Sequence, residues 1–141
     1  MFKLKYYIKT FGCQMNVNDS EFIAGQLENI GCTAALNIDE ANIIILNTCC
    51  VRRKVEHKIY SMAGKISLLK KENPEIIFGI CGCLAQKEKS FIKEKIPAID
   101  LIFGPSQVAS IDVLLKKYLY SKKTIIHCNN KKIFKINNTP I

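Results

Sequence analysis

Short, unbroken apolar runs alternate with longer stretches of helical periodicity, and this alternation constrains the fold more than any other feature. Ile43–Leu46 is one such run, and Ile76–Ile80 and Leu101–Phe103 are two others. Apolar runs without polar residues at alternate positions are typical of strands that are covered on both faces. Strands that alternate with helices form parallel sheets. We therefore predict a three-layer α/β fold, in which a mostly parallel sheet of about five strands carries helices on both faces.

The segments between these runs carry helical signals. Asn18 is predicted as the N-cap of a helix, with Glu21 as its capping-box partner, and Gly31 is predicted to end that helix. Phe22, Ile23, Leu27 and Ile30 would form its apolar face. Strands are also expected at Leu4–Thr10, Cys32–Leu36 and Thr124–His127, and helices from Val51 to about Asn73, at Leu84–Ile96 and at Gln107–Tyr120. A Rossmann-like and a flavodoxin-like strand order both fit this pattern.

Length and composition indicate one globular domain. The chain has 141 residues, of which 48% are hydrophobic and 23% charged, so it can bury a core without disulfides or metals. We expect the domain to span residues 1–120, followed by an edge strand and a linker or tail over 121–141. The formal net charge of +9 is compatible with an anionic partner.

The number of cysteines and the length of the apolar runs indicate in which cellular compartment the protein is expected. The seven cysteines are an odd number, and no apolar leader precedes them, which favours thiols or metal ligands over a disulfide framework. No apolar run is long enough to span a bilayer. A cytoplasmic protein without a membrane partner is therefore expected.

Three cysteines follow predicted strands directly. They are Cys13 in the segment after the first strand, Cys49 after Ile43–Leu46, and Cys83 after Ile76–Ile80. The carboxyl ends of parallel strands lie at one edge of a sheet, where ligands bind. A [4Fe–4S] cluster normally takes four cysteines, so three would leave one iron open to another ligand. Gly12 and Gly82 each precede a cysteine and allow close approach of the backbone.

A structural role without metal binding is also possible for each cysteine, because a free cysteine is often a small buried apolar residue. Cys32 and Cys128 are assigned a structural or incidental role. Cys50 and Cys81 neighbour the candidate ligands and could replace them, although Cys81 is expected to close its strand and pack inward. Two other functions also remain: an α/β thiol or phosphate-handling domain that uses Cys13 alone, and an RNA-binding module with structural cysteines.

The same segments carry a specific resemblance. The sequence Lys9–Asn16 reads KTFGCQMN, Asn18–Glu21 reads NDSE, Asn47–Arg52 reads NTCCVR, and Cys81–Gln86 reads CGCLAQ. Together they resemble the N-terminal domain of the methylthiotransferases, which are radical S-adenosylmethionine enzymes. The GCQMN form is most similar to the branch of tRNA 2-methylthio-dimethylallyladenosine synthases.

This resemblance implies that Cys13, Cys49 and Cys83 bind an auxiliary [4Fe–4S] cluster. The implied reaction adds a methylthio group to carbon 2 of an isopentenylated adenosine next to the anticodon, so the implied partner is a tRNA anticodon stem-loop. The family's radical domain uses S-adenosylmethionine and a second [4Fe–4S] cluster held by a Cys-x3-Cys-x2-Cys motif. That motif is absent from this sequence. The chain is therefore expected to be a fragment without turnover of its own, which needs the radical domain as a partner and can lack its cluster when isolated.

Polar residues flank the three candidate ligands. Gln14, Asn16, Asn47 and Thr48 could hydrogen-bond to cluster sulfurs or to substrate, or they could simply cap loops. Arg52 lies at the predicted start of a helix, where a cation opposes the helix dipole. An anion nearby, either a substrate phosphate or the cluster, would resolve that conflict.

Overall fold

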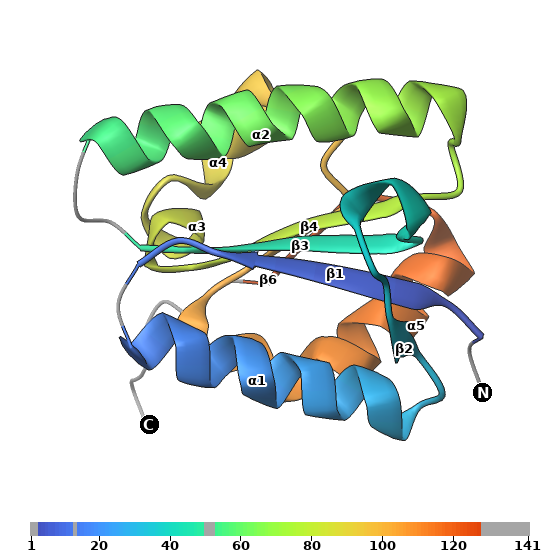
Figure 1. The fold of residues 1–141 in the computed structure, drawn as a ribbon. Helices are drawn as coiled ribbons and strands as arrows, with labels where there is room; N and C mark the ends of the chain where they lie inside the picture. The colour runs from blue at the N-terminus through green and yellow to red at the C-terminus, as the bar shows by residue number, and fades with distance from the viewer. Residues whose placement is uncertain (1–2, 13, 50–52, 128–141) are drawn as a thin grey trace.

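The sheet and its covering helices follow the predicted alternation. The structure is a computed structural model that describes residues 3–12, 14–49 and 53–127. One parallel sheet lies in the middle, with α2, α3 and α4 on one face and α1 and α5 on the other (Figure 1). The elements are β1 (Lys5–Thr10), α1 (Gln14–Asn29), β2 (Thr33–Ala34), a 3₁₀ turn (Ile38–Glu40), β3 (Ile43–Thr48), α2 (Arg53–Glu72), β4 (Ile77–Gly82), α3 (Cys83–Lys87), α4 (Lys89–Lys95), β5 (Leu101–Phe103), a 3₁₀ segment (Pro105–Ser110), α5 (Ile111–Ser121) and β6 (Ile125–His127).

The strand order settles the choice that the sequence left open. The six strands are arranged β2-β1-β3-β4-β5-β6, and every neighbouring pair is parallel. This is the flavodoxin-like order, with one strand more than the five predicted. The chain changes direction across the sheet between β1 and β3, and in open α/β sheets that switch point is where ligands bind.

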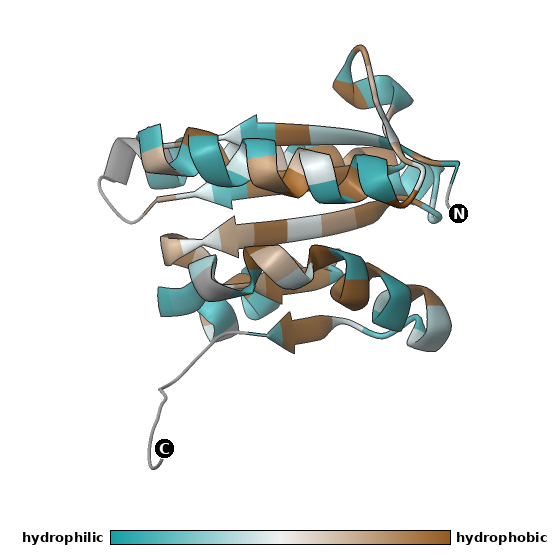
Figure 2. Cartoon of the chain, turned by 90° about the horizontal axis from the view of Figure 1, so that it is seen from below, coloured by the Kyte–Doolittle hydropathy of each residue, from teal (hydrophilic) through white to brown (hydrophobic). Residues whose placement is uncertain are grey.

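The apolar run of β3 shows why this sheet is covered on both sides. Ile43 and Ile45 pack in the cluster beneath the sheet with Ile23 and Leu27 of α1. Ile44 and Leu46 pack in the opposite cluster, which also includes residues of α2, α3 and α4. Hydrophobic residues accordingly occupy much of the central strands, while the helices carry both hydrophobic and hydrophilic residues (Figure 2). The predicted three-layer α/β class is confirmed.

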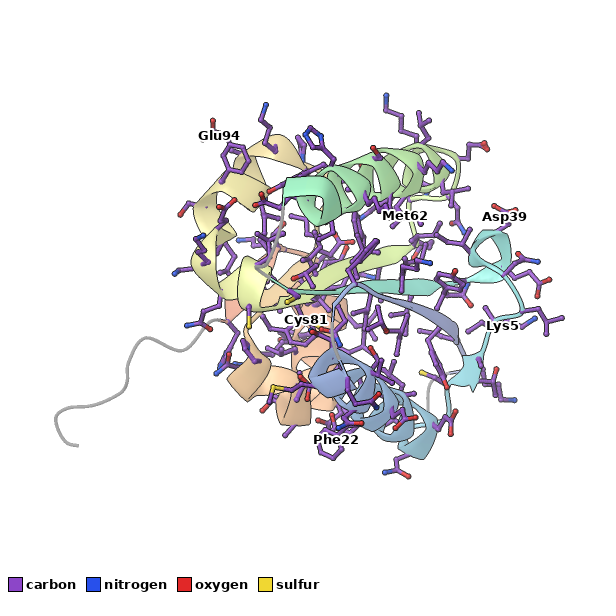
Figure 3. All side chains as sticks on the ribbon, turned by 60° about the vertical axis from the view of Figure 1, so that its left-hand side comes forward. Lys5, Phe22, Asp39, Met62, Cys81 and Glu94 are labelled. Carbon is purple, nitrogen blue, oxygen red and sulfur yellow. The ribbon has the colours of Figure 1, made fainter. Side chains whose placement is uncertain are left out.

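The start of α1 differs from the prediction. The helix begins at Gln14, four residues before Asn18, so Asn18 lies inside it and is not an N-cap. Phe22 is half exposed and points away from the sheet, whereas Ile23 is fully buried (Figure 3). The predicted end is confirmed: Gly31 has φ +105°, and the N–H groups of Gly31 and Cys32 donate to the carbonyls of Glu28 and Leu27, as in a Schellman motif.

Two predicted helices are each split. The expected helix at Leu84–Ile96 is interrupted at Glu88, whose φ of −121° and ψ of 32° are not helical. Leu84 before the break and Ile92 after it both pack in the core above the sheet. The segment from Pro105 starts as a 3₁₀ turn and becomes α-helical only at Ile111. The edge strand predicted at Thr124–His127 is confirmed as β6.

Candidate metal centre

Three segments that are far apart in sequence meet at one edge of the sheet. They follow β1, β3 and β4, and we call them the carboxyl rim: Phe11–Gly12, Thr48–Cys49 and Gly82–Cys83. Thr10 lies opposite Asn47, and Thr48 lies opposite Gly82, in the pairing of the strands. The Phe11 N–H donates to the Asn47 carbonyl at 2.8 Å. The ladder thus continues to the rim, and the register brings these strand ends side by side.

The two rim glycines are required by close backbone approach. Gly12 has φ +139°, and a Cβ there would lie 2.7 Å from the Cys49 Cβ and would overlap the Asn16 side-chain oxygen. Gly82 has φ +101°, and its Cβ would lie 2.9 Å from the Thr48 nitrogen and overlap the Thr48 carbonyl oxygen. Any other residue would be strained and too large at either position. The glycines therefore allow the three segments to pack against one another.

A buried polar network fixes the rim from beneath. The Asn47 side-chain amide donates to the Asn16 carbonyl at 2.7 Å and to the Ser20 hydroxyl at 2.9 Å. The Asn16 side-chain amide donates to the Thr48 carbonyl at 3.0 Å. The Thr48 hydroxyl in turn donates to the Cys81 carbonyl at 2.6 Å. These bonds join the first turns of α1 to the ends of β3 and β4.

The four described cysteines fall into two environments. Cys49 is partly buried and Cys83 exposed, both at the rim, and both are free thiols. Cys81 and Cys32 are buried in the core. Burial, with a smaller contribution from Asp19, raises the pKa of the Cys81 thiol, and burial also raises the pKa of Cys32. Since the thiolate is the metal-binding form, the core pair is poorly suited to coordination.

The predicted flanking residues do not share one role. Asn47 and Thr48 are fully buried, and their side chains bond within the protein as described. Gln14 is exposed and its side chain donates to Asn18. Cys13, Cys50, Arg52 and Cys128 lie outside the described residues. The hydroxyls of Ser20 and Thr10 lie 2.7 Å apart beside Asn47, and neither residue was predicted to belong to the site. The NDSE motif, which contains Ser20, was the sequence signal that could have indicated it.

The donor set of the rim fits a thiolate-bound cluster. Within the described residues no three His, Cys, Asp or Glu side chains form a group that could hold a metal ion, and the candidate third ligand, Cys13, is not among them. Cys49 and Cys83 supply soft sulfur donors, which iron–sulfur clusters use. The two glycines let the backbone at Gly12 lie close to Cys49 and the backbone at Gly82 lie close to Thr48.

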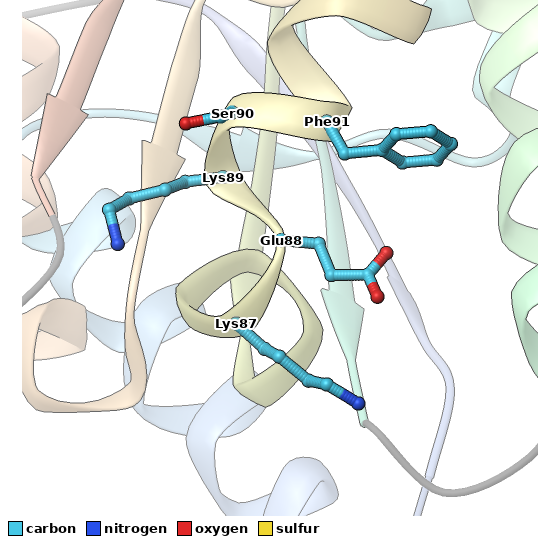
Figure 4. Close-up of a pocket in the computed structure, with 5 residues that line it drawn as sticks. All are labelled: Lys87, Glu88, Lys89, Ser90 and Phe91. Atoms are coloured by element: carbon cyan, nitrogen blue, oxygen red, sulfur yellow. The ribbon is translucent and has the colours of Figure 1, made fainter.

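A hollow at the helix break is separate from the cysteines. It has a volume of about 510 Å³ and is lined by five consecutive residues, Lys87 to Phe91. Lys87, Glu88 and Phe91 point to one side of the α3–α4 junction, and Lys89 and Ser90 to the other (Figure 4). None of these side chains is a typical ligand for soft metals, so this hollow does not extend the candidate centre.

In the described part of the chain, no helix combines the length and the hydropathy needed to cross a bilayer.

Comparison with known proteins identifies relatives along most of the chain. A relative from Sulfurihydrogenibium sp. (strain YO3AOP1) is 46% identical over 122 residues, which cover 86% of this chain and 28% of the relative. A relative from Bacillus subtilis (strain 168) is 39% identical over 138 residues, covering 96% of this chain and 27% of the relative. Both are named tRNA-2-methylthio-N(6)-dimethylallyladenosine synthase. The chain thus spans little more than a quarter of the length of these curated relatives.

The family match covers the same elements that build the rim. Residues 5–104 match the model described as uncharacterized protein family UPF0004. That range runs from the start of β1 to the residue after β5 and includes all three rim segments. The chain therefore belongs to the UPF0004 family, the N-terminal domain of the methylthiotransferases.

Proposed function

We propose that this chain is the auxiliary [4Fe–4S] cluster domain of a tRNA methylthiotransferase. Cys13, Cys49 and Cys83 would be the ligands, and residues 1–120 would make up the domain, with β6 as an added edge strand. The whole enzyme would attach a methylthio group to carbon 2 of an isopentenylated adenosine beside the anticodon. This step would need S-adenosylmethionine and a second cluster on a radical domain, so the chain alone would not turn over. Such an enzyme would work in the cytoplasm.

One observation carries the proposal most directly: the backbone of the rim is built for close convergence of its loops. Gly12 and Gly82 admit no side chain because the neighbouring segments, Cys49 and Thr48, occupy that space. Each of these glycines immediately precedes a candidate ligand in the sequence. Close approach of these segments supports the proposal, because cysteines that follow three neighbouring strands would then share one polynuclear centre.

The polar network supports the same proposal by fixing loop positions. Asn47 and Thr48 are buried and bonded to other parts of the rim, so they would position the cysteine-bearing loops and would not touch substrate. Asn16 would have the same role from α1. When bound, a cluster with three protein ligands supplies an iron with an open coordination position for a sulfur-containing group.

The test is anaerobic reconstitution of the purified chain with iron and sulfide. We expect about four irons per chain and a visible absorption band. Cys13→Ala, Cys49→Ala and Cys83→Ala should each lose most of that absorption. Cys32→Ala and Cys128→Ala should retain it, and they serve as matched controls because each also removes one thiol.

Cys81→Ala separates the two environments further. Cys81 is two residues from Cys83 but lies inside β4 and is fully buried, so its loss should leave iron content unchanged in the folded fraction. Circular dichroism would report whether each variant is folded. Iron uptake that is unaffected by Cys49→Ala would refute the three-ligand assignment.

A further inference from the structure

A basic groove runs beside the carboxyl rim and is separate from the cysteines. It has a volume of about 330 Å³ and lies between the end of β1 and one side of α2. Phe11 belongs both to this groove and to the rim, so the groove opens next to the candidate metal centre. Its lining residues are Lys9, Phe11, His57, Lys58, Ser61, Met62 and Lys65.

The spacing along α2 explains how this groove forms. Lys58, Met62 and Lys65 are three or four residues apart and therefore lie on one stripe of the helix. The adjacent stripe, with Ile59 and Ile66, is buried in the core above the sheet. Met62 lies on the side of α2 toward the sheet (Figure 3) and packs partly against that core. The groove therefore runs along the edge of α2, where the helix surface turns from the sheet toward solvent.

The short strand β2 leaves this edge of α2 uncovered. β2 has only two residues and pairs with Lys5 and Tyr6. The second half of β1, which leads to Lys9 and Phe11, has no strand on that side within the described part of the chain. No further βα unit therefore covers the sheet face beside α2 at this point.

The groove is positively charged, and no acidic side chain in its lining offsets that charge. Three lysines and a histidine line it, and no carboxylate does. The two ion pairs formed between described residues are Lys5–Glu40 and Lys70–Asp100, so they leave Lys9, Lys58 and Lys65 available. The Lys9 ammonium lies 6.0 Å from the centroid of the Phe11 ring, which holds it over the groove by a cation–π contact.

We propose that this groove binds the phosphate backbone of the RNA substrate. Lys58 and Lys65 are about 10 Å apart along the helix axis, close to the axial rise of three stacked nucleotides. The ammonium groups of Lys9, Lys58 and Lys65 would contact phosphates, while Phe11 and Met62 form an apolar floor against the ribose. This inference rests on the proposed function for its choice of RNA, and it assigns binding residues that the cysteine site does not include.

The test is RNA binding by the 141-residue chain as a function of salt. A fluorescent anticodon stem-loop RNA would be titrated with the wild-type chain and with the triple variant Lys9→Gln/Lys58→Gln/Lys65→Gln. Each lost phosphate contact in a single-stranded region lowers the log–log salt slope by about 0.7. We therefore expect the slope to fall by about 2 and the dissociation constant at low salt to rise roughly tenfold.

A second triple variant controls for net charge. Lys116→Gln/Lys117→Gln/Lys123→Gln also removes three positive charges, but these exposed lysines lie on α5 and after it, away from the groove. This variant should keep the wild-type salt slope. Equal weakening by the two variants, or no binding of the RNA by the wild-type chain, would overturn the groove assignment.

The cluster proposal and the groove proposal can be refuted independently of each other. Iron uptake by the groove variant should equal that of the wild-type chain, because no groove residue is a candidate ligand. If the cysteine variants retain their iron while the groove variant loses RNA affinity, the cluster assignment is wrong and the groove stands. If the groove variant binds RNA normally while the cysteine variants lose iron, only the groove is wrong.

Discussion

Two regions of this molecule hold the same residue type in contrasting environments. At the carboxyl rim, Cys49 and Cys83 lie in or beside loops and reach the surface. In the core, Cys32 and Cys81 are almost completely buried among apolar side chains. Cys81 and Cys83 are separated only by Gly82, yet one lies in a buried strand and the other begins a helix.

This difference shows that position relative to the strand end decides the environment of a cysteine. Burial inside the sheet raises the pKa of a thiol, because the charged thiolate would lose its solvation. The rim also depends on glycine and asparagine for its shape, while the core depends on apolar packing. Four stability measurements can test whether the two regions differ in this way.

The largest effect is expected at a rim glycine. Gly82→Ala places a Cβ against the Thr48 backbone at a positive φ, and we expect a loss of at least about 3 kcal/mol in the free energy of unfolding. Urea denaturation would measure it. Gly64→Ala is the matched control, because that helical glycine has open space around it, and it should raise stability by up to about 1 kcal/mol. A Gly82→Ala loss below 1 kcal/mol would contradict the close-approach argument.

The next effect is expected in the buried network. Asn47→Ala removes the donor to Asn16 and Ser20 and the acceptor for the Asn16 amide. We expect a loss of about 2–3 kcal/mol, because polar groups remain buried without their partner. The measurement is again urea denaturation, with the metal-free chain. A neutral result would mean that the network does not support the rim.

A smaller, pH-dependent effect should come from the core cysteine. Burial raises the pKa of Cys81 above its ordinary value of 9.0, so the folded state keeps a proton that the unfolded state releases. The associated stability is complete below pH 9 and is lost as pH rises further, by up to about 1.4 kcal/mol per pH unit.

Unfolding curves between pH 8 and 10 would measure this slope. Cys81→Ala should flatten it, whereas Gly64→Ala, which removes no titratable group, should leave it unchanged. Tyr6 and Tyr60, whose pKa values are raised from 10.0 to about 12, add to this slope as the pH nears 10, and they do so equally in the wild-type chain and in the variants. Equal slopes in the two variants would contradict a raised pKa for the Cys81 thiol.

The smallest effect is expected at Asn18. If Asn18 were an N-cap, Asn18→Ala would cost about 1 kcal/mol. In the structure it lies inside α1, exposed, and accepts one hydrogen bond from Gln14, so the loss should be under about 0.5 kcal/mol. Thermal unfolding of the variant next to the wild-type chain distinguishes these values.

The sequence predicted the elements whose signals are local. The apolar run at Ile43–Leu46 was sufficient to predict a buried strand, and Gly31 was sufficient to predict the end of a helix. Strand burial selects apolar residues and a positive φ selects glycine, so both features are visible in the residue types. Cys13, Cys49 and Cys83 were selected because each follows a strand, and the structure brings the segments of Cys49 and Cys83 together at one rim. Their role as ligands remains a prediction.

Other features depend on contacts that no local pattern contains. The early start of α1 is supported by Asn16, whose side chain bonds to Thr48, 32 residues away; this long-range contact overrides the capping-box signal at Asn18. The break at Glu88 has no proline or glycine to mark it in the sequence. The strand order likewise required the structure.

The points at which α1 and α2 begin have an electrical consequence for the rim. α1 begins at Gln14, directly after Cys13, and α2 begins at Arg53, four residues after Cys49. The peptide dipoles of each helix sum to a partial positive charge at its first turn. The backbone itself therefore favours negative charge at this edge, and it does so at every pH because peptide dipoles do not titrate. Substituting the lysines of the groove would leave that contribution intact.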